Sequence, residues 1–351
     1  MNRSGFVMPY VLGVVVLLTM IVTLLVSRSQ IFLPSSKRAQ ESISSQMLAL
    51  SGVEIGKALL VKAYTPEKKQ EASNAQTINK PKQSQEAIHH FYQTILPLLN
   101  TWQTYEFEQA RDGFQGTIKV CISCEEGKLD LNALWNFDKN QFACDAGPRE
   151  IRSLYEQFFD RIGTLSKTSN LMPALQDFFT KRGYIANDPT ELFILKEYRA
   201  FSSSIFFSPD EQPQGTGKLF LNDLFTIWTG KASLDPFLLS DSWRTVLELK
   251  KHPLQEKIKE IVPKISSQTS VKTSWDTLFS PLYEKNFNSL PKSIDSILQT
   301  KFGPKVFSVL SYGIIGRNTC SLLAIIQVEQ QQPEGNKEAP IEVKVRKVYW
   351  L

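Results

Sequence analysis

The sequence predicts an α+β protein in which a long N-terminal helix first spans a membrane and then packs on an antiparallel sheet, with a large, mainly helical domain inserted into that sheet. Three observations lead to this fold class. An apolar run of about 20 residues lies near the N-terminus. Apolar residues at helical spacing fill the middle of the chain. Stretches of alternating apolar and polar residues, typical of strands, stand on both sides of that helical part.

Composition is consistent with a folded domain outside the membrane. The chain has 351 residues, 42% hydrophobic and 21% charged, so about two domains with a sizeable core can follow the membrane helix. The net charge of +5 is mild, and no block of Lys and Arg is dense enough to suggest nucleic-acid binding. We therefore expect no nucleic acid among the partners.

The apolar run extends from Phe6 to Val26 and is long enough to cross a bilayer as a helix. A secretory signal peptide would end in a cleavage site after a shorter apolar core, whereas the plausible cleavage point here, between Gly5 and Phe6, precedes the run. The membrane helix would then survive processing. Basic residues lie on both sides of the run, so the positive-inside rule does not decide its orientation.

The short basic leader, the Gly5-Phe6 step and the apolar helix together resemble the type IV prepilin signal. The resemblance implies that a prepilin peptidase cuts after Gly5 and that Phe6 becomes the N-methylated first residue. The fifth mature residue is Tyr10, where major pilins and pseudopilins carry a Glu that pairs with a neighbour's terminal amine. A subunit without that Glu is ill suited to the body of a pilus. An uncleaved signal anchor with a short cytoplasmic tail has the same hydropathy and remains the alternative.

Beyond the membrane the helix is expected to continue as a stalk to residue 64, with a kink at Pro34. Ile43, Met47 and Leu50 recur at helical spacing in this stalk. The stretch 49–60 resembles the corresponding part of pseudopilins, whose outer helix packs on a sheet. A polar loop is expected over residues 65–85.

Strand patterns follow the loop. After a short helix at 91–98, residues 105–107 and 118–120 alternate as in a hairpin, with a turn at Asp112-Gly113. The chain then reads Gly127-Lys-Leu-Asp-Leu-Asn-Ala-Leu134, which predicts a short strand and a helix capped by Asn132. A nearly identical phrase recurs at 217–224, although two short matches do not make a repeat array.

This phrase resembles one in the large K-type minor pseudopilins of type II secretion, where it marks the exit from the sheet into an inserted helical domain. The residues that match it are Gly127, Leu129, Leu131, Asn132 and Leu134. Helical spacing then recurs around 151–162, 193–198 and 258–262, and strand patterns return at 306–309, 321–328 and 341–345. This order of elements is the K-type layout, and the resemblance covers essentially the whole chain. It implies the following domains: leader 1–5, transmembrane and stalk helix 6–64, first part of the pilin-like domain 65–147, helical insertion 148–302, and C-terminal strands 303–351.

The resemblance implies a single-pass protein of the inner membrane with its C-terminal domain in the periplasm. Its expected place is the tip of the type II secretion pseudopilus, where it would initiate assembly and support protein export across the outer membrane. The implied partners are the I-type and J-type minor pseudopilins, other pseudopilus and inner-membrane secretion components, and the prepilin peptidase. Two other interpretations stay open: an unprocessed bitopic periplasmic scaffold and a membrane-anchored envelope hydrolase.

The sequence offers little for catalysis, and we expect no enzyme. It has three His residues and no zinc-protease, P-loop, nucleophile-elbow or dinucleotide motif. The stretch from Ser289 to Lys292 has SxxK spacing, but Pro291 disfavours the helix that would bring the two side chains together. No cofactor is expected.

Metal binding and disulfides are left open by the sequence. Glu125, Glu126 and Asp130 are oxygen ligands of the kind that calcium takes, although loop carboxylates are more often simply solvated. The four cysteines are candidates for disulfides or free thiols, and the first two have the spacing of half a zinc site that Cys144 and a His could complete. The cysteines are Cys121, Cys124, Cys144 and Cys320, and the histidines are His89, His90 and His252.

Overall fold

The structure is a computed structural model, and it describes residues 7–65, 89–211, 217–249, 275–299, 303–330 and 341–351. Its elements are the long helix, a five-stranded sheet and a group of short helices, so the predicted α+β class is confirmed. The helical spacing at 258–262, most of the loop at 65–85 and the Gly5-Phe6 step lie outside the described residues.

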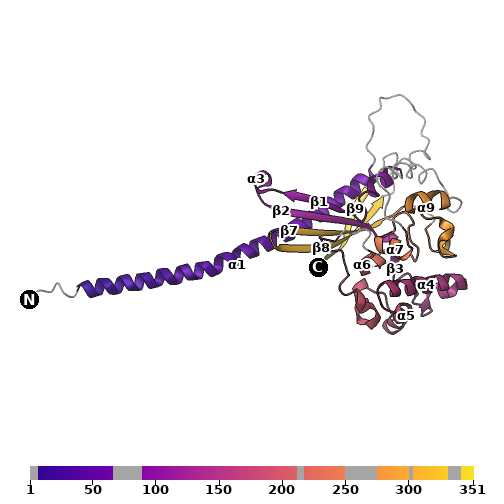
Figure 1. The fold of residues 1–351 in the computed structure, drawn as a ribbon, viewed down its shortest axis with the longest axis horizontal. Coiled ribbons are helices and arrows are strands. Elements are labelled where there is room, and N and C mark those ends of the chain that lie inside the picture. The colour runs from indigo at the N-terminus through magenta and orange to yellow at the C-terminus, as the bar shows by residue number, and fades with distance from the viewer. Residues whose placement is uncertain (1–6, 66–88, 212–216, 250–274, 300–302, 331–340) are drawn as a thin grey trace, which may run out of the picture.

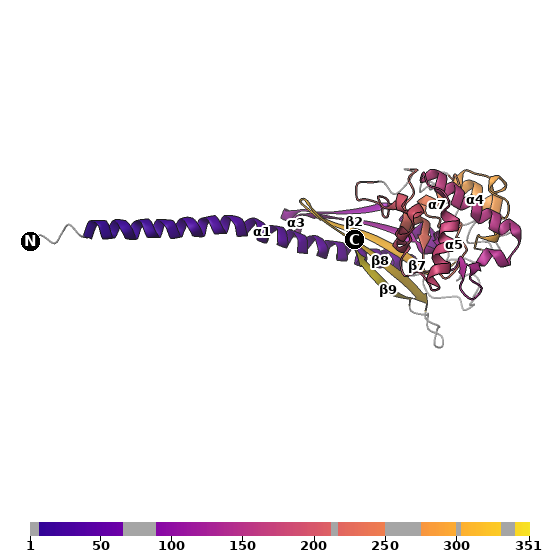
Figure 2. The same ribbon diagram turned by 90° about the horizontal axis from the view of Figure 1, so that it is seen from below.

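Helix α1 (Val7–Tyr64) is a single helix of 58 residues, about 87 Å long. It continues through Pro34, so the lost hydrogen bond of that proline does not end the helix. Its first half projects away from the rest of the chain, while its second half lies along the sheet (Figures 1 and 2). The predicted stalk helix is therefore confirmed.

The main sheet is antiparallel and has the strand order β1-β2-β7-β8-β9. Its strands are β1 (Trp102–Phe107), β2 (Gly116–Cys124), β7 (Val306–Ile315), β8 (Asn318–Gln330) and β9 (Ile341–Trp350). β1 and β2 form the predicted hairpin, with the short helix α3 (Gln109–Asp112) at its tip and Gly113 in the left-handed region at φ 77°. The predicted helix at 91–98 is also present, with residues 89–95 helical and the last three in a turn. All three predicted C-terminal strands are present and longer than expected.

The second half of α1 packs over β7, with β2 and β8 on either side. Leu48, Ala49 and Val53 on this face of α1 are buried in one core with the sheet. Position 313 on β7 requires a glycine, because a Cβ atom on Gly313 would clash with the backbone carbonyl of Ser45 on α1. The helix therefore lies unusually close to the strand beneath it.

Between β2 and β7 the chain forms the group of short elements at the end of the sheet remote from the N-terminus (Figures 1 and 2). The longest is α4 (Arg149–Leu165), which contains the predicted helical spacing at 151–162. The predicted helix at 193–198 is instead made of 3₁₀ turns. The other helical elements are η2 (Glu125–Gly127), η3 (Ala143–Ala146), α5 (Leu171–Arg182), η4 (Pro189–Ile194), η5 (Lys196–Phe201), α6 (Leu221–Leu224), α7 (Asp241–Val246), α9 (Trp275–Tyr283), η7 (Phe287–Ser289) and η8 (Ile294–Ser296).

Two small sheets complete this part of the molecule. Strands β4 (Trp135–Asn136) and β5 (Gln141–Phe142) pair antiparallel, and β3 (Leu129–Asp130) pairs parallel with β6 (Phe225–Thr226). The β3–β6 pair brings the two similar phrases of the sequence together. They are not equivalent in structure. The first phrase forms strand β3 followed by a turn at 131–134, whereas the second has no strand at 219–220 and forms helix α6 at the positions that correspond to that turn.

Candidate functional site: the exposed helix and the buried junction

The first half of α1 presents apolar side chains to its surroundings along its whole length. Residues Tyr10–Gln30 have a mean hydropathy of 2.6 and none of the segment is buried within the chain. At 21 residues it is long enough to cross a bilayer. The hydroxyls of Thr19 and Thr23 donate back to helix carbonyls at 2.6 and 2.7 Å, which satisfies them without water. This helix is a candidate membrane span.

The second half of α1 also keeps an apolar face away from the sheet. Ile43, Met47 and Leu50, four and three residues apart, share this face. Ile43 and Met47 are each 61% exposed and Leu50 is 40% exposed. The sheet covers the opposite face, so these three side chains have no cover within the described parts of the chain.

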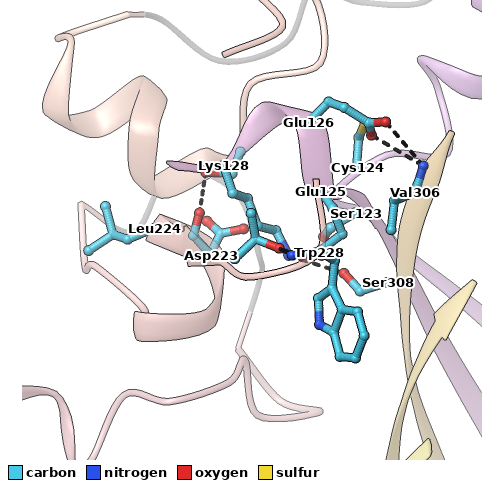
Figure 3. Close-up of polar contacts among 12 residues, drawn as sticks. Ser123, Cys124, Glu125, Glu126, Lys128, Asp223, Leu224, Trp228, Val306 and Ser308 are labelled. Carbon is cyan, nitrogen blue, oxygen red and sulfur yellow. Dashed lines mark hydrogen bonds and ion pairs between the residues drawn. The ribbon is translucent and has the colours of Figure 1, made fainter. Parts of the chain in front are cut away.

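A second unusual region lies where the chain leaves β2. Charged residues of the segment 125–130 are buried there, between the sheet and the helical segment (Figure 3). We call this region the junction. Its buried charged residues from this segment are Glu125, Glu126, Lys128 and Asp130, and two more, Asp223 and Asp235, come from later in the chain. The sequence suggested that the loop carboxylates of the segment 125–130 are solvated. In the structure they are buried in the core.

Glu125 and Lys128 form a buried ion pair at 2.5 Å. The other carboxylate oxygen of Glu125 accepts a hydrogen bond from Thr226 on β6 at 2.5 Å. The Lys128 ammonium also donates to Ser308 on β7 at 3.1 Å (Figure 3). This network therefore joins β6 of the helical segment to a central strand of the sheet, and a buried pair with further hydrogen bonds avoids the cost of isolated charges.

Glu126 binds the start of β7. Its carboxylate accepts the backbone N–H groups of Lys305 at 2.7 Å and Val306 at 3.2 Å (Figure 3), and its backbone carbonyl accepts the N–H of Asp235 at 2.7 Å. Burial raises the pKa of Glu126, while these backbone donors oppose that rise. Burial also raises the pKa of the Cys124 thiol, which donates to Glu126 at 3.3 Å.

Asp130 organises two turns at once. One oxygen accepts the N–H groups of Asn132 at 2.9 Å and Ala133 at 3.1 Å. The other accepts from the N–H and hydroxyl of Thr229 at 2.9 and 3.0 Å and from the N–H of Gly230 at 2.8 Å. A fully buried carboxylate is satisfied here by backbone and hydroxyl donors rather than by a cation.

The predicted role of Asn132 as a helix cap is wrong. Residues 131–134 form a turn, in which the Asp130 carboxylate accepts the N–H groups of Asn132 and Ala133 and the Asp130 carbonyl accepts that of Leu134, so no helix begins at Asn132. Asn132 instead holds the chain 54 residues further on, donating to the carbonyl of Ala186 at 3.0 Å and accepting its N–H at 2.7 Å. Its role is to attach a distant loop.

The other residues of the phrase are structural. Leu129, Leu131 and Leu134 are buried in the main core. Gly127 lies directly against the backbone of Leu238, whose carbonyl a Cβ would strike. The phrase therefore places the chain as it passes from the sheet to the helical segment.

Two buried aspartates of the junction were not found by sequence reasoning. Asp223 accepts the N–H of Ser242 at 2.7 Å and borders a cavity of about 40 Å³, with room for a water or two. Asp235 accepts the N–H of Phe237 at 2.9 Å. Burial raises the pKa of Asp223, and burial together with the nearby Glu126 raises that of Asp235 to about 7. Asp223 lies in the short helix α6 and Asp235 in a loop, where aspartate normally indicates a solvated turn.

The described residues form neither the metal site nor the disulfides that the sequence left open. Among the described residues, no group of three or more His, Cys, Asp or Glu is placed to hold a metal ion. The three carboxylates proposed for calcium serve separate donors, as described above, and His252 lies outside the described residues. All four cysteines are free thiols, and Cys121 and Cys124 belong to cores on opposite faces of the sheet. Cys144 is buried and Cys320 is half-buried.

The SxxK stretch is also not assembled for catalysis. Ser289 is exposed at the end of η7, and its hydroxyl donates to the carbonyl of Asn286 at 2.6 Å. Lys292 is exposed as well.

Comparisons with known proteins show a structural likeness. No protein family model matches the sequence, and no curated protein matches it. Among solved structures, the chain is similar to a chain of the GspK-GspI-GspJ complex of the type 2 secretion system from enterotoxigenic Escherichia coli. The two are 12% identical, the match covers 90% of this chain and 99% of that chain, and the TM-score is 0.41. At that identity and TM-score, the function of this chain must be argued from its own residues.

Proposed function

We propose that this protein is a K-type minor pseudopilin, a subunit of a type II secretion pseudopilus rather than an enzyme. It would be anchored in the inner membrane by α1 with its folded part in the periplasm. There it would assemble with I-type and J-type minor pseudopilins, initiate the pseudopilus and support protein export. Processing by a prepilin peptidase between Gly5 and Phe6, followed by N-methylation of Phe6, belongs to the same proposal.

The observation that carries the proposal is the continuity of α1. One helix joins a membrane-length apolar segment to the sheet, and its outer half keeps Ile43, Met47 and Leu50 exposed on the face away from the sheet. A helix that only held the protein to the membrane would have no need of an apolar face beyond the lipid. An apolar face there is what packing against the helices of other subunits requires.

A position at the tip is supported by two features. Tyr10 stands where a filament subunit would carry the Glu that pairs with a neighbour's amine. The helical segment between β2 and β7 adds bulk at the end of the sheet remote from the membrane helix (Figure 1). Bulk at that end is compatible with the last position of a filament, where no further subunit has to be stacked above it.

The described residues do not support the alternative hypothesis that the protein is a hydrolase. The buried carboxylates of Glu126 and Asp130 accept hydrogen bonds from backbone donors, that of Glu125 is paired with Lys128, and Ser289 and Lys292 of the SxxK stretch are both exposed. A catalytic site would need converging ionisable groups at a cleft that admits substrate. The unprocessed scaffold differs from a pseudopilin mainly in its N-terminus and in its partners.

Affinity purification of the full chain from its own membranes tests the proposal. Pilin-like subunits should co-purify with it, in amounts that exceed those from cells expressing a chain truncated before the sheet. Export of the cognate secreted proteins should stop when the gene is deleted and return when it is restored. Normal export in the deletion strain, with no pilin-like protein in the purified fraction, would favour the scaffold.

A further inference from the structure

The charged residues of α1 nearest to the end of the candidate membrane span are all basic. Residues 7–40 include three basic residues and no acidic one, and the basic ones are Arg28, Lys37 and Arg38. Glu41 is the first acidic residue of the chain. Arg28 lies in the last turn of the apolar span. Where it leaves the membrane, the helix therefore presents only positive charge.

A turn of the sheet reaches almost the same level. Gly316 and Arg317 connect β7 to β8 at the end of the sheet that faces the first half of α1, the end that α3 marks in Figures 1 and 2. Directly after them, the side-chain amide of Asn318 donates to the carboxylate of Glu41 at 2.8 Å. Arg38 is three residues, or about 4.5 Å, nearer to the membrane than Glu41. The turn with Arg317 therefore lies about one helical turn above Arg38.

Arg38 is on the side of α1 that faces the sheet. Arg38, Ser45 and Gly52 are seven residues apart, and an α-helix drifts by only about 20° over each such step. Ser45 and Gly52 both lie directly against β7. Arg38 continues this line just beyond the end of β7, where the strand turns at Arg317. The two arginines are therefore on the same side of the helix.

Neither arginine is neutralised within the described parts of the chain. Both are exposed, and neither forms an ion pair there. The nearest acidic residue, Glu41, faces Lys37 at 3.9 Å. Glu108 and Asp112 belong to the β1–β2 turn, two strands away from β7, and Asp112 is bound by Arg111. Positive charge is therefore in excess around Arg38 and Arg317.

Arg38 stands at the height of lipid headgroups. The sequence stays apolar from Gln30 to Leu33, so the hydrocarbon layer ends between these two residues. Arg38 lies five to eight residues further, or about 8–12 Å. The headgroup layer is about 5–8 Å deep, and helical side chains lean towards the helix N-terminus, which is the membrane side here. The long Arg38 side chain can therefore reach the phosphates. A tilt of about 20°, usual for membrane helices, lowers Arg317 towards them when it is directed to the sheet side.

A phosphate diester suits two arginines. Each guanidinium presents a planar fork of N–H donors that matches two phosphate oxygens. A zwitterionic headgroup brings a cation of its own beside the phosphate, whereas an anionic headgroup does not. Excess positive charge at the membrane surface therefore favours the anionic lipid.

We propose that Arg38 and Arg317 together bind the phosphate of an anionic phospholipid, in the leaflet from which the second half of α1 emerges. Bound in this way, the lipid links the helix to the β7–β8 turn and holds the folded part against the membrane surface. The inference depends on α1 spanning a membrane and not on the pseudopilin assignment.

Native mass spectrometry of the full chain tests the site. The chain would be inserted into nanodiscs with equal amounts of phosphatidylcholine and phosphatidylglycerol, and the lipids retained on release would be identified. We expect retained phosphatidylglycerol to exceed phosphatidylcholine, and this ratio to fall about fivefold in Arg38→Gln and in Arg317→Gln, since each removes one cation at the bilayer surface. The matched control is Arg111→Gln, because Arg111 is exposed at the same end of the sheet but is bound to Asp112. It should leave the ratio unchanged.

Three results would overturn the inference. One is an unchanged ratio in the double variant of Arg38→Gln and Arg317→Gln. Another is an equal fall in Arg111→Gln, which would indicate general surface charge instead of a site. The third is loss of the retained lipid when inorganic phosphate is added, which would assign the two arginines to free phosphate. Urea denaturation should give the same stability for all variants, because the substituted side chains are exposed. A lower ratio then reports lipid binding and not misfolding.

Discussion

The first half of α1 and the junction reverse the usual distribution of side chains in opposite ways. The helix exposes apolar residues such as Leu12 and Leu17, 67% and 60% exposed, while the junction buries charged residues such as Glu126 and Asp130, 4% and 0% exposed. Exposed apolar side chains point to contacts outside the chain. Buried charges need contacts inside it, and the junction supplies them. One region is therefore expected to matter for assembly and the other for folding.

The largest effect on folding is expected from Asp130→Ala. The substitution removes the charged acceptor of the part-buried N–H groups at Ala133 and Gly230 and so releases both turns, at a cost of about 4 kcal/mol in the free energy of unfolding. Urea denaturation followed by tryptophan fluorescence measures the loss. Asp130→Asn keeps one acceptor oxygen and should lose less. Equal stability of Asp130→Ala and the unmodified protein would mean that the junction does not hold the two parts together.

A smaller loss is expected from Gly127→Ala. The added Cβ meets the backbone carbonyl of Leu238, so the chain must shift at the exit from β2, at a cost of about 1–3 kcal/mol. Gly183→Ala makes a useful comparison, because Gly183 has a positive φ but open space around it. The same denaturation experiment separates a clash from backbone strain, and a harmless Gly127→Ala would contradict the close approach.

The junction should also make stability depend on pH. Burial raises the pKa of Asp235 to about 7, above its value in the unfolded chain, so the folded state binds a proton that the unfolded state does not. Stability should therefore rise as the pH falls from 8 towards 5, by about 1.4 kcal/mol per pH unit at most for this proton. Thermal denaturation across that range measures the trend. Asp235→Asn should flatten it, and an unchanged slope in that variant would assign the trend to another group.

The smallest effect on folding is expected from Met47→Ser. The side chain is 61% exposed, so the stability of the isolated chain should change by less than about 0.5 kcal/mol. Association with other subunits should nevertheless weaken, because an apolar contact is lost. Co-purification compared with urea denaturation separates the two effects. A large loss of stability would show that this face of α1 is covered within the chain.

The helix and the sheet were predictable because their periodicity is local and sustained. Apolar spacing continues along α1, and β9 alternates from Ile341 to Val345, so neighbouring residues support the same structure. The junction was not predictable in this way. Glu125 is satisfied by Thr226, 101 residues away, and Glu126 by Lys305, 179 residues away. No local pattern distinguishes such a carboxylate from a solvated one.

The error at Asn132 has the same origin on a smaller scale. Asn is a good helix cap, and the following residues are compatible with a helix. The competing acceptor, Asp130, lies only two residues earlier, but its effect depends on its being fixed from the other side by Thr229 and Gly230. A local propensity was overridden by a distant contact.

The most direct test of the pseudopilin proposal is mass spectrometry of the N-terminus of the protein isolated from its own membrane. The account predicts a mature chain that begins at Phe6 and carries one added methyl group. A chain that still begins at Met1, in cells whose prepilin peptidase processes other substrates, would contradict it and leave the unprocessed bitopic scaffold.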